Sequence, residues 1–375
     1  MTSYENKERR GLSDQELLWA VGLSMMPGVG AITARRLVAF CGGLEGVYYR
    51  NAEALQQVPG IGPVISRAIA RSKVLQRAEQ ELEFAARHGI RVLCYLGQDY
   101  PQRLNHCDDG PVVLFFKGQG QLNPARVLAV VGTRKPTAQG RALVHELVGG
   151  LAGSVGLLVS GLAYGIDAEA HRAALDAGLS TVAVMATGLD RIYPAMHAKL
   201  AHQMLERGGW VSDFISGTLP DRENFPKRNR IIAGLSDAVV VAEAASRGGA
   251  LITAELAQEY NRDVFAIPGR PGDLMSEGCN RLIRENRAAL ITGAADLSYA
   301  MRWDQGARTP TSQKALFPIT DPESMLLWEL LDQPRGMDYL VARSGMSHGR
   351  ISSLLLAMEL DGQMVVLPGN RWSRG

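Results

Sequence analysis

The stretch Val127-Leu128-Ala129-Val130-Val131-Gly132-Thr133-Arg134-Lys135 points to the fold class of this chain. Five apolar residues in a row are typical of a strand that is buried on both faces, as in a parallel sheet. The glycine and the two cations that follow form a loop suited to an anion. The sequence therefore predicts an α/β unit with a phosphate-seeking loop at the carboxyl end of this strand.

Short apolar runs alternate with amphipathic segments from about residue 90 to residue 297. The expected strands are 127–131, 157–160, 181–185, 211, 238–241, 264–267 and 289–291. The expected helices are 139–152, 167–177, 195–206, 251–260 and 280–285. This alternation predicts a mostly parallel sheet with helices on both faces. Such sheets bind ligands in the crevice outside the carboxyl ends of their strands, so these loops are where recognition is expected.

The loops at those carboxyl ends share glycines at expected helix starts and cations beside them. The segment Phe225-Pro226-Lys227-Arg228-Asn229-Arg230 places three cations at an expected helix start, where they oppose the helix dipole unless an anion binds. Phe225, Tyr164 and Tyr193 could stack a base. The predicted site residues are Gly132, Thr133, Arg134, Lys135, Ser160, Gly161, Tyr164, Phe225, Lys227, Arg228, Asn229, Arg230, Arg247, Gly248, Gly249 and Thr253.

Some residues near this site have a structural alternative. One of the three cations in the 227–230 segment is expected to form an internal ion pair with Asp213 or Glu243. Asp167 is expected to cap its helix, and His171 to be packed or hydrogen-bonded rather than catalytic.

The N-terminal region contains a repeat, Met26-Pro27-Gly28-Val29-Gly30 and Val58-Pro59-Gly60-Ile61-Gly62, and a helix-like run follows each copy. Each copy resembles a helix-hairpin-helix motif, which predicts a helical, SAM-like domain over residues 1–80. Backbone amides at such turns suit a DNA phosphate, so duplex-backbone contacts are expected at Gly28, Gly30, Gly60 and Gly62. The alternative is that the paired hairpins serve only as a packed domain core.

The composition excludes several classes of protein. A length of 375 residues suggests two or three domains. Lys and Arg total 40 against 38 Asp and Glu, so nucleic-acid affinity must come from local clusters rather than from bulk charge. The four cysteines form no Cys-x-x-Cys pair, which argues against a zinc site and for reduced thiols. The polar first ten residues and the lack of a membrane-length apolar run predict a cytoplasmic protein with no membrane partner. No metal and no cofactor are expected.

The C-terminal region predicts a separate domain. Residues 301–320 are rich in Thr, Pro, Ser and Gln and are expected to form a linker. Residues 321–375 predict three helices followed by a short hairpin, which together describe a winged helix. Its third helix, opened by Ser347, has no cationic face, which favours protein interaction or weak DNA binding over sequence-specific recognition.

Four segments closely resemble the DNA-processing protein DprA (Smf) family: Val131-Gly132-Thr133-Arg134, Ser160-Gly161-Leu162-Ala163-Tyr164-Gly165-Ile166-Asp167, Phe225 to Gly234, and Ser246 to Thr253. The resemblance implies a Rossmann-like DNA-binding domain over residues 85–300 between the helical domain and the winged helix. It implies a non-catalytic homodimer that protects incoming single-stranded DNA and loads the recombinase RecA onto it during natural transformation. Single-strand-binding protein is a further candidate partner. Tyr164 departs from the family, which usually has Arg or Lys there.

An enzymatic alternative comes from phosphoribohydrolases of the lysine-decarboxylase-like family, which cleave a nucleotide's N-glycosidic bond. They share this sheet and a Gly-Gly loop followed by a catalytic Glu, and Glu255 and Arg230 occupy roughly comparable places. Leu251 and Ile252 stand where that family has a further glycine and threonine. The resemblance is therefore one of motifs only.

Overall fold

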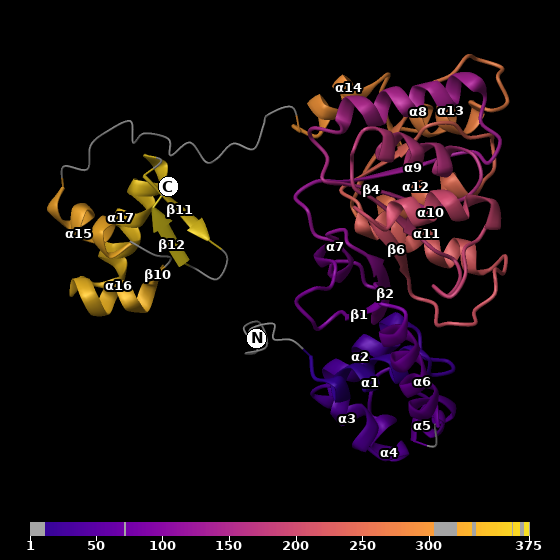
Figure 1. Ribbon diagram of the computed structural model, residues 1–375. Coiled ribbons are helices and arrows are strands. Elements are labelled where there is room, and N and C mark those ends of the chain that lie inside the picture. The colour runs from indigo at the N-terminus through magenta and orange to yellow at the C-terminus, as the bar shows by residue number, and fades with distance from the viewer. Residues whose placement is uncertain are drawn as a thin grey trace. The chain divides into compact units, whose positions relative to one another are not determined.

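The computed structural model describes residues 12–70, 73–303, 321–331, 335–361, 363–367 and 371–374. The chain forms two compact units, residues 1–304 and 305–375 (Figure 1). The first unit contains a helical region and a large sheet, and the second contains three helices and a small sheet. The predicted linker falls almost entirely on residues 304–320, which lie outside the described residues, as do the first ten residues.

The large sheet has nine strands in the order β1-β2-β6-β5-β4-β3-β7-β8-β9. The strands are β1 (Arg91–Cys94), β2 (Val113–Gly118), β3 (Val127–Val131), β4 (Leu157–Ser160), β5 (Thr181–Val184), β6 (Gly209–Ser212), β7 (Ala238–Val241), β8 (Asp263–Ala266) and β9 (Ala289–Leu290). All strands from β3 to β9 pair in parallel, whereas β1 and β2 add an antiparallel edge beside β6. The predicted Rossmann-like, mostly parallel sheet is confirmed, and the antiparallel edge was not predicted.

The strand order reverses between β3 and β7. From β3 the chain builds β4, β5 and β6 on one side, then returns to place β7 against the other side of β3. Loops leaving the carboxyl ends of β3 and β7 therefore diverge to opposite faces and leave a crevice between them.

Helices cover both faces of this sheet (Figure 1). They are α8 (Ala138–Leu151), α9 (Ile166–Asp176), a 3₁₀ turn at Ala195–His197, α10 (Ala198–Met204), α11 (Asn224–Leu235), α12 (Gly249–Glu259), α13 (Glu277–Arg284) and α14 (Ala294–Ala300). Leu128 and Val130 of β3 share a core with α8 and α9. Ala129 and Val131 point to the opposite face and share a core with α11 and α12. This alternation is the two-residue period of a strand.

The N-terminal helical region is confirmed. It contains α1 (Asp14–Ser24), α2 (Ala31–Cys41), α3 (Leu44–Tyr49), α4 (Ala52–Leu55), α5 (Pro63–Ala70) and α6 (Val74–Arg87). A helix precedes and follows each Gly-x-Gly turn, and the first turn glycines, Gly28 and Gly60, have φ of 78° and 85°. Such positive φ values favour glycine. Arg36 of α2 donates to the carbonyl oxygen of Pro59 at 2.9 Å, which connects α2 to the second turn.

The C-terminal winged helix is also confirmed. It contains α15 (Pro322–Leu330), β10 (Arg335–Gly336), α16 (Met337–Ser344), α17 (His348–Leu360), β11 (Met364–Leu367) and β12 (Arg371–Arg374). Ser347 caps α17 by accepting from the Arg350 amide, as predicted. The Arg350 guanidinium lies 2.6 Å from Glu323, so an internal ion pair takes up one cation of the third helix. The predicted turn of the hairpin, 368–370, lies outside the described residues. No helix among the described residues is long and apolar enough to cross a membrane.

Candidate nucleic-acid interface

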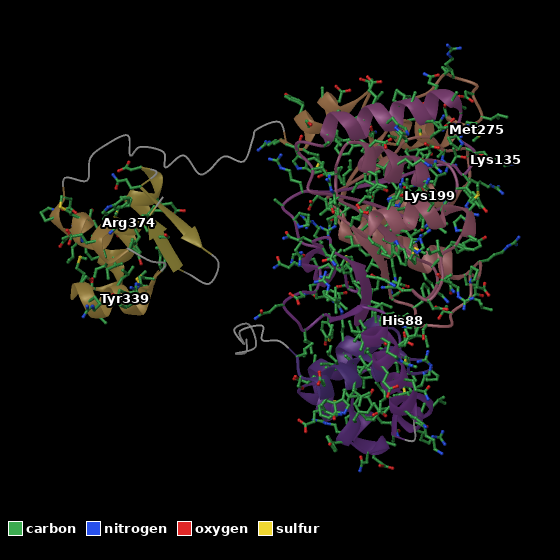
Figure 2. All side chains as sticks on the ribbon, viewed as in Figure 1. His88, Lys135, Lys199, Met275, Tyr339 and Arg374 are labelled. Carbon is green, nitrogen blue, oxygen red and sulfur yellow. The ribbon has the colours of Figure 1, made fainter. Side chains whose placement is uncertain are left out.

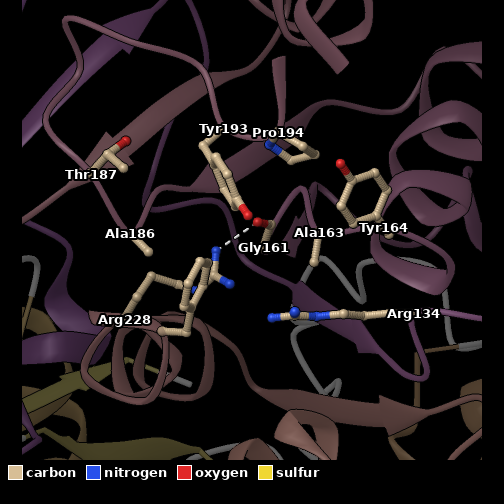
Figure 3. A pocket seen from close by; sticks show the side chains of 10 residues that line it. Arg134, Gly161, Ala163, Tyr164, Ala186, Thr187, Tyr193, Pro194 and Arg228 are labelled. Carbon is tan, nitrogen blue, oxygen red and sulfur yellow. Dashed lines mark hydrogen bonds between the residues drawn. The ribbon is translucent and has the colours of Figure 1, made fainter. Parts of the chain in front are cut away.

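Two adjoining cavities lie at the carboxyl ends of the central strands. The larger, which we call the groove, has a volume of about 380 Å³ and runs between the loop after β3, the start of α11 and the start of α12. The smaller, which we call the recess, has a volume of about 20 Å³ and lies toward the loops after β4 and β5 (Figure 3). Four residues line both cavities: Arg134, Ala163, Phe225 and Arg228.

Glycines allow the loops after β3 and β4 to press together. A Cβ on Gly132 would stand 2.5 Å from the Ile166 side chain. Gly165 has φ of 77°, and a Cβ there would stand 2.3 Å from the Thr133 carbonyl oxygen. On the recess side, a Cβ on Gly161 would stand 2.6 Å from the Arg228 guanidinium. A side chain at Gly132 or Gly165 would force the facing loop to shift, and one at Gly161 would displace the Arg228 guanidinium, so the two loops and Arg228 form one tightly packed wall.

Arg228 is the most buried cation of this wall, with an exposed fraction of 4%. Its Nη1 donates to the carbonyl oxygens of Gly161, at 2.6 Å, and of Val184, and its Nε donates to Asn229. Burial lowers the pKa of Arg228 to about 10, and the nearby Asp167 carboxylate opposes that effect. The other terminal nitrogen of Arg228 points toward the guanidinium of Arg134 (Figure 3).

Asp167 supports the wall from inside the protein. Its carboxylate accepts from the amides of Gly161 at 3.2 Å and Ala163 at 3.4 Å. Burial raises the pKa of Asp167, and Arg228 opposes the rise. The N-cap of α9 is Gly165, so the prediction that Asp167 caps the helix is wrong in detail. Asp167 follows in the first turn and ties down the loop that leads into the helix.

Aromatic rings border the recess. The guanidinium carbon of exposed Arg134 lies 5.3 Å from the centre of the Phe225 ring. The Phe225 ring lies 5.8 Å from that of Tyr193, and Tyr164 lies edge-on to His197 at 5.4 Å. Tyr164 and Tyr193 are each about two-fifths exposed, so their ring surfaces are available to a stacking partner.

The start of α12 forms the far end of the groove. Arg247, Gly248 and Gly249 are exposed there, and the first residues of an 11-residue helix line the cavity. The side-chain amide of Asn229 donates to the Gly249 carbonyl oxygen at 3.2 Å, and the Thr253 hydroxyl donates to the same oxygen at 3.1 Å. These bonds fix the glycine turn against α11. A helix start with an adjacent cation is suited to an anion.

Four predicted site residues lie outside both cavities. Ser160 is buried and its hydroxyl donates to the Val130 carbonyl oxygen. Lys135 extends from the surface (Figure 2). Lys227 is exposed and lies 3.6 Å from Glu223. Arg230 lies 2.5 Å from Asp213 and also donates to the Asp109 carbonyl oxygen, which confirms the predicted internal ion pair and removes Arg230 from the groove.

The other predicted residues of the sheet loops line one or both cavities: Gly132, Thr133, Arg134, Gly161, Tyr164, Phe225, Arg228, Asn229, Arg247, Gly248, Gly249 and Thr253. The prediction missed Thr187 and Pro194, which line the recess from the loop after β5. The sequence places that loop at a carboxyl strand end, where ligands are expected, but neither residue was among the predicted site residues.

The enzymatic alternative gains no support from the geometry. Glu255 lines neither cavity and lies 3.3 Å from Arg287, while Arg230 is committed to Asp213. His171 is buried with its Nδ1 2.7 Å from the Thr181 hydroxyl, and burial lowers its pKa to about 3. It is the hydrogen-bonded, packed histidine that was predicted. No cluster of three or more His, Cys, Asp or Glu that could hold a metal occurs among the described residues.

Two family profiles match this chain. The profile of DNA recombination-mediator protein A matches residues 91–302, and that of the DprA winged helix domain matches residues 309–370. The chain belongs to the DprA (Smf) family. Protein Smf of Synechocystis is 32% identical over 97% of this chain and 100% of its own length. Protein Smf of Escherichia coli is 36% identical over 79% of this chain and 83% of its own length.

Solved structures of DprA proteins have the same fold. The X-ray structure of DNA processing protein A from Streptococcus pneumoniae has a TM-score of 0.66 at 32% identity and covers 77% of this chain and 98% of that one. A structure of the Helicobacter pylori protein, described for its single-stranded DNA binding mode, has a TM-score of 0.52 at 28% identity and covers 57% of this chain and 96% of that one.

Proposed function

We propose that this DprA-family chain binds single-stranded DNA in the groove and recess and acts as a recombination mediator without breaking or forming a covalent bond. The observation that carries the proposal is the pair Arg134 and Arg228, which line both cavities and point toward each other. Two facing cations repel each other unless an anion lies between them. A backbone phosphate supplies that charge, and the glycine turn at α12 with Arg247 is suited to the next phosphate.

The recess and its rings favour single strands over duplex. An unpaired base can leave its stack and rest on Phe225, Tyr193 or Tyr164, whereas the bases of a duplex stay paired and stacked. The preference for single strands should therefore come from contacts with unpaired bases, and most of the affinity from contacts with phosphates. The single-stranded DNA named in the description of the Helicobacter pylori structure supports this assignment.

Membership of a family of recombination mediators supports the further proposal that the chain protects incoming DNA and loads RecA onto it. A chain that holds single-stranded DNA can shield it and present it to a recombinase. The test is RecA filament formation on an oligonucleotide coated with single-strand-binding protein. The filament should form faster with the chain than without it, and an unchanged rate would remove the loading role. The proposed homodimer and the duplex contacts of Gly28, Gly30, Gly60 and Gly62 remain predictions.

Replacing Arg134 with alanine should weaken binding of a fluorescent single-stranded oligonucleotide roughly ten-fold, which corresponds to one charge-assisted hydrogen bond of about 1.5 kcal/mol. The slope of log affinity against log salt should fall by about 0.7, the value for one lost phosphate contact on a single strand. Lys227→Ala is the matched control, because Lys227 is a nearby cation that lines neither cavity. Equal effects of the two substitutions would contradict the assignment of Arg134.

Replacing Tyr164 with lysine should have the opposite effect on the salt dependence. Tyr164 lines the recess close to Arg134, so a lysine there adds a cation within reach of the same backbone. The slope of log affinity against log salt should rise by about 0.7. Tyr164→Phe keeps the ring and should leave the slope unchanged. A lysine variant with an unaltered slope would mean that the strand does not pass position 164.

A further inference from the structure

We propose that Arg35, in the helical region, is a positioning residue for the DNA groove and acts through the segment of residues 103–110. The part of this inference that concerns DNA affinity rests on the proposed function. The segment includes most of the four-residue helix α7 (Gln102–Asn105) and is part of the connection from β1 to β2. It lies between α2, which carries Arg35, and α11, which carries Arg228.

The segment is bonded to α11 on one side. Arg230 of α11 donates to the Asp109 carbonyl oxygen. Arg262 joins the two elements directly, because its Nη2 donates to the carbonyl oxygens of Arg103 at 2.9 Å and of Gly234 at 3.2 Å. A Cβ on Gly234 would stand 2.5 Å from Leu104, so α11 and the segment are in close contact. A shift of the segment therefore moves or releases α11.

Arg35 holds the other side of the segment. Its Nη1 donates to the carbonyl oxygens of Asn105 at 3.4 Å and Cys107 at 3.2 Å, and its Nη2 to that of Leu104 at 3.3 Å. Two of these oxygens also accept a backbone amide, Leu104 from Cys107 at 3.2 Å and Cys107 from Gly110 at 3.0 Å, so Arg35 adds side-chain donors to a segment held by tight turns. A Cβ on Gly110 would stand 2.6 Å from Arg35 Nη2, so the guanidinium is enclosed by the segment.

The geometry of α11 connects this contact to the groove. Residues two positions apart lie about 200° apart around a helix. Arg230 therefore faces the segment while Arg228 faces the groove, on opposite sides of the same turn. Losing the Arg35 contact should loosen the segment and then α11, with Arg228 and Asn229 moving with it. By reciprocity, DNA in the groove should stabilise the segment and α2.

The test compares Arg35→Ala with Arg36→Ala. Arg36 lies next in α2, but its guanidinium bonds the Pro59 carbonyl oxygen inside the helical region. In the free protein, Arg35→Ala should speed amide hydrogen exchange in α11 and in residues 102–110, and Arg36→Ala should not. Helix α8, on the opposite face of the sheet, is the internal reference, because general destabilisation would speed its exchange too.

Affinity for a single-stranded oligonucleotide should fall about five-fold in Arg35→Ala, the lower end of typical coupling between sites. The salt slope should stay at the wild-type value, because Arg35 contacts no phosphate in this proposal. Arg35→Lys keeps the charge but lacks the planar guanidinium that donates to several carbonyls, so it should give smaller changes of the same sign. It replaces the alanine variant in this test if that variant does not fold.

Unchanged exchange in α11 for both Arg35 variants would overturn the inference, and so would a reduced salt slope, which would indicate direct DNA contact. If the wild-type chain bound no single-stranded DNA but the exchange effect appeared, the proposed function would fail while the coupling of α2 to α11 would stand.

Discussion

Arg228→Ala is expected to lower the affinity for single-stranded DNA at least ~100-fold and the free energy of unfolding by roughly 3 kcal/mol. The substitution removes the donors from the buried carbonyl oxygens of Gly161 and Val184. It also removes the positive charge that opposes the effect of burial on the Asp167 carboxylate. Both losses destabilise the folded state alone, so the free energy of unfolding falls. The affinity for DNA falls because the lost guanidinium is one of the two that face each other across the proposed phosphate position.

Urea unfolding and fluorescence anisotropy at one salt concentration would separate the two effects. Arg134→Ala is the control for stability, because exposed Arg134 should affect DNA binding without a comparable loss of stability. Arg228→Lys should recover part of the stability but little of the affinity, since an ammonium cannot donate to both carbonyls and the phosphate in the same planar geometry. Wild-type affinity in a folded Arg228→Ala protein would refute the site.

The sheet was predictable where its strands are buried on both faces. The runs that became β3, β4, β5 and β7 contain no charged residue, and their only polar residues, Thr181 and Ser160, stand at a strand end. This pattern can be recognised without knowledge of tertiary contacts. β1 was missed for a physical reason, whereas β2 contains a buried apolar run to which the same pattern applies. β1 begins with Arg91 and is only partly buried, and its pairing with β2 joins residues across the whole of the 95–112 segment. Such pairing is set by the completed fold rather than by local pattern.

The sequence predicted which loops form the site, but not which side of α11 each cation occupies. Arg134 follows a strand directly, so the strand end fixes its position. The cations of α11 follow a helical period, and three of them within four positions point in three directions. The sequence indicated that one would pair with an internal carboxylate. Only the packing of α11 between the groove and the 103–110 segment determines that Arg228 faces the groove and Arg230 does not.

Arg230→Met should destabilise the protein by about 3 kcal/mol at neutral pH, because it leaves Asp213 buried without its partner. Burial raises the pKa of Asp213, and Arg230 opposes that rise. Without Arg230 the folded-state pKa of Asp213 should rise further above its unfolded value. The folded variant then binds a proton more readily than the unfolded chain, so its stability relative to wild type should improve as the pH falls through that pKa.

The double variant Arg230→Met/Asp213→Asn distinguishes this cause from simple loss of packing. An amide carries no charge, so the double variant should be more stable than Arg230→Met at neutral pH. The difference between its free energy of unfolding and that of wild type should not change with pH in this window. Urea unfolding of the three proteins at neutral and mildly acidic pH measures both effects. A deficit in Arg230→Met that stays constant with pH would mean that the uncompensated Asp213 charge is not its source. DNA binding gives the second criterion: because Arg230 lies outside both cavities, folded Arg230→Met should keep the wild-type salt slope, unlike Arg134→Ala.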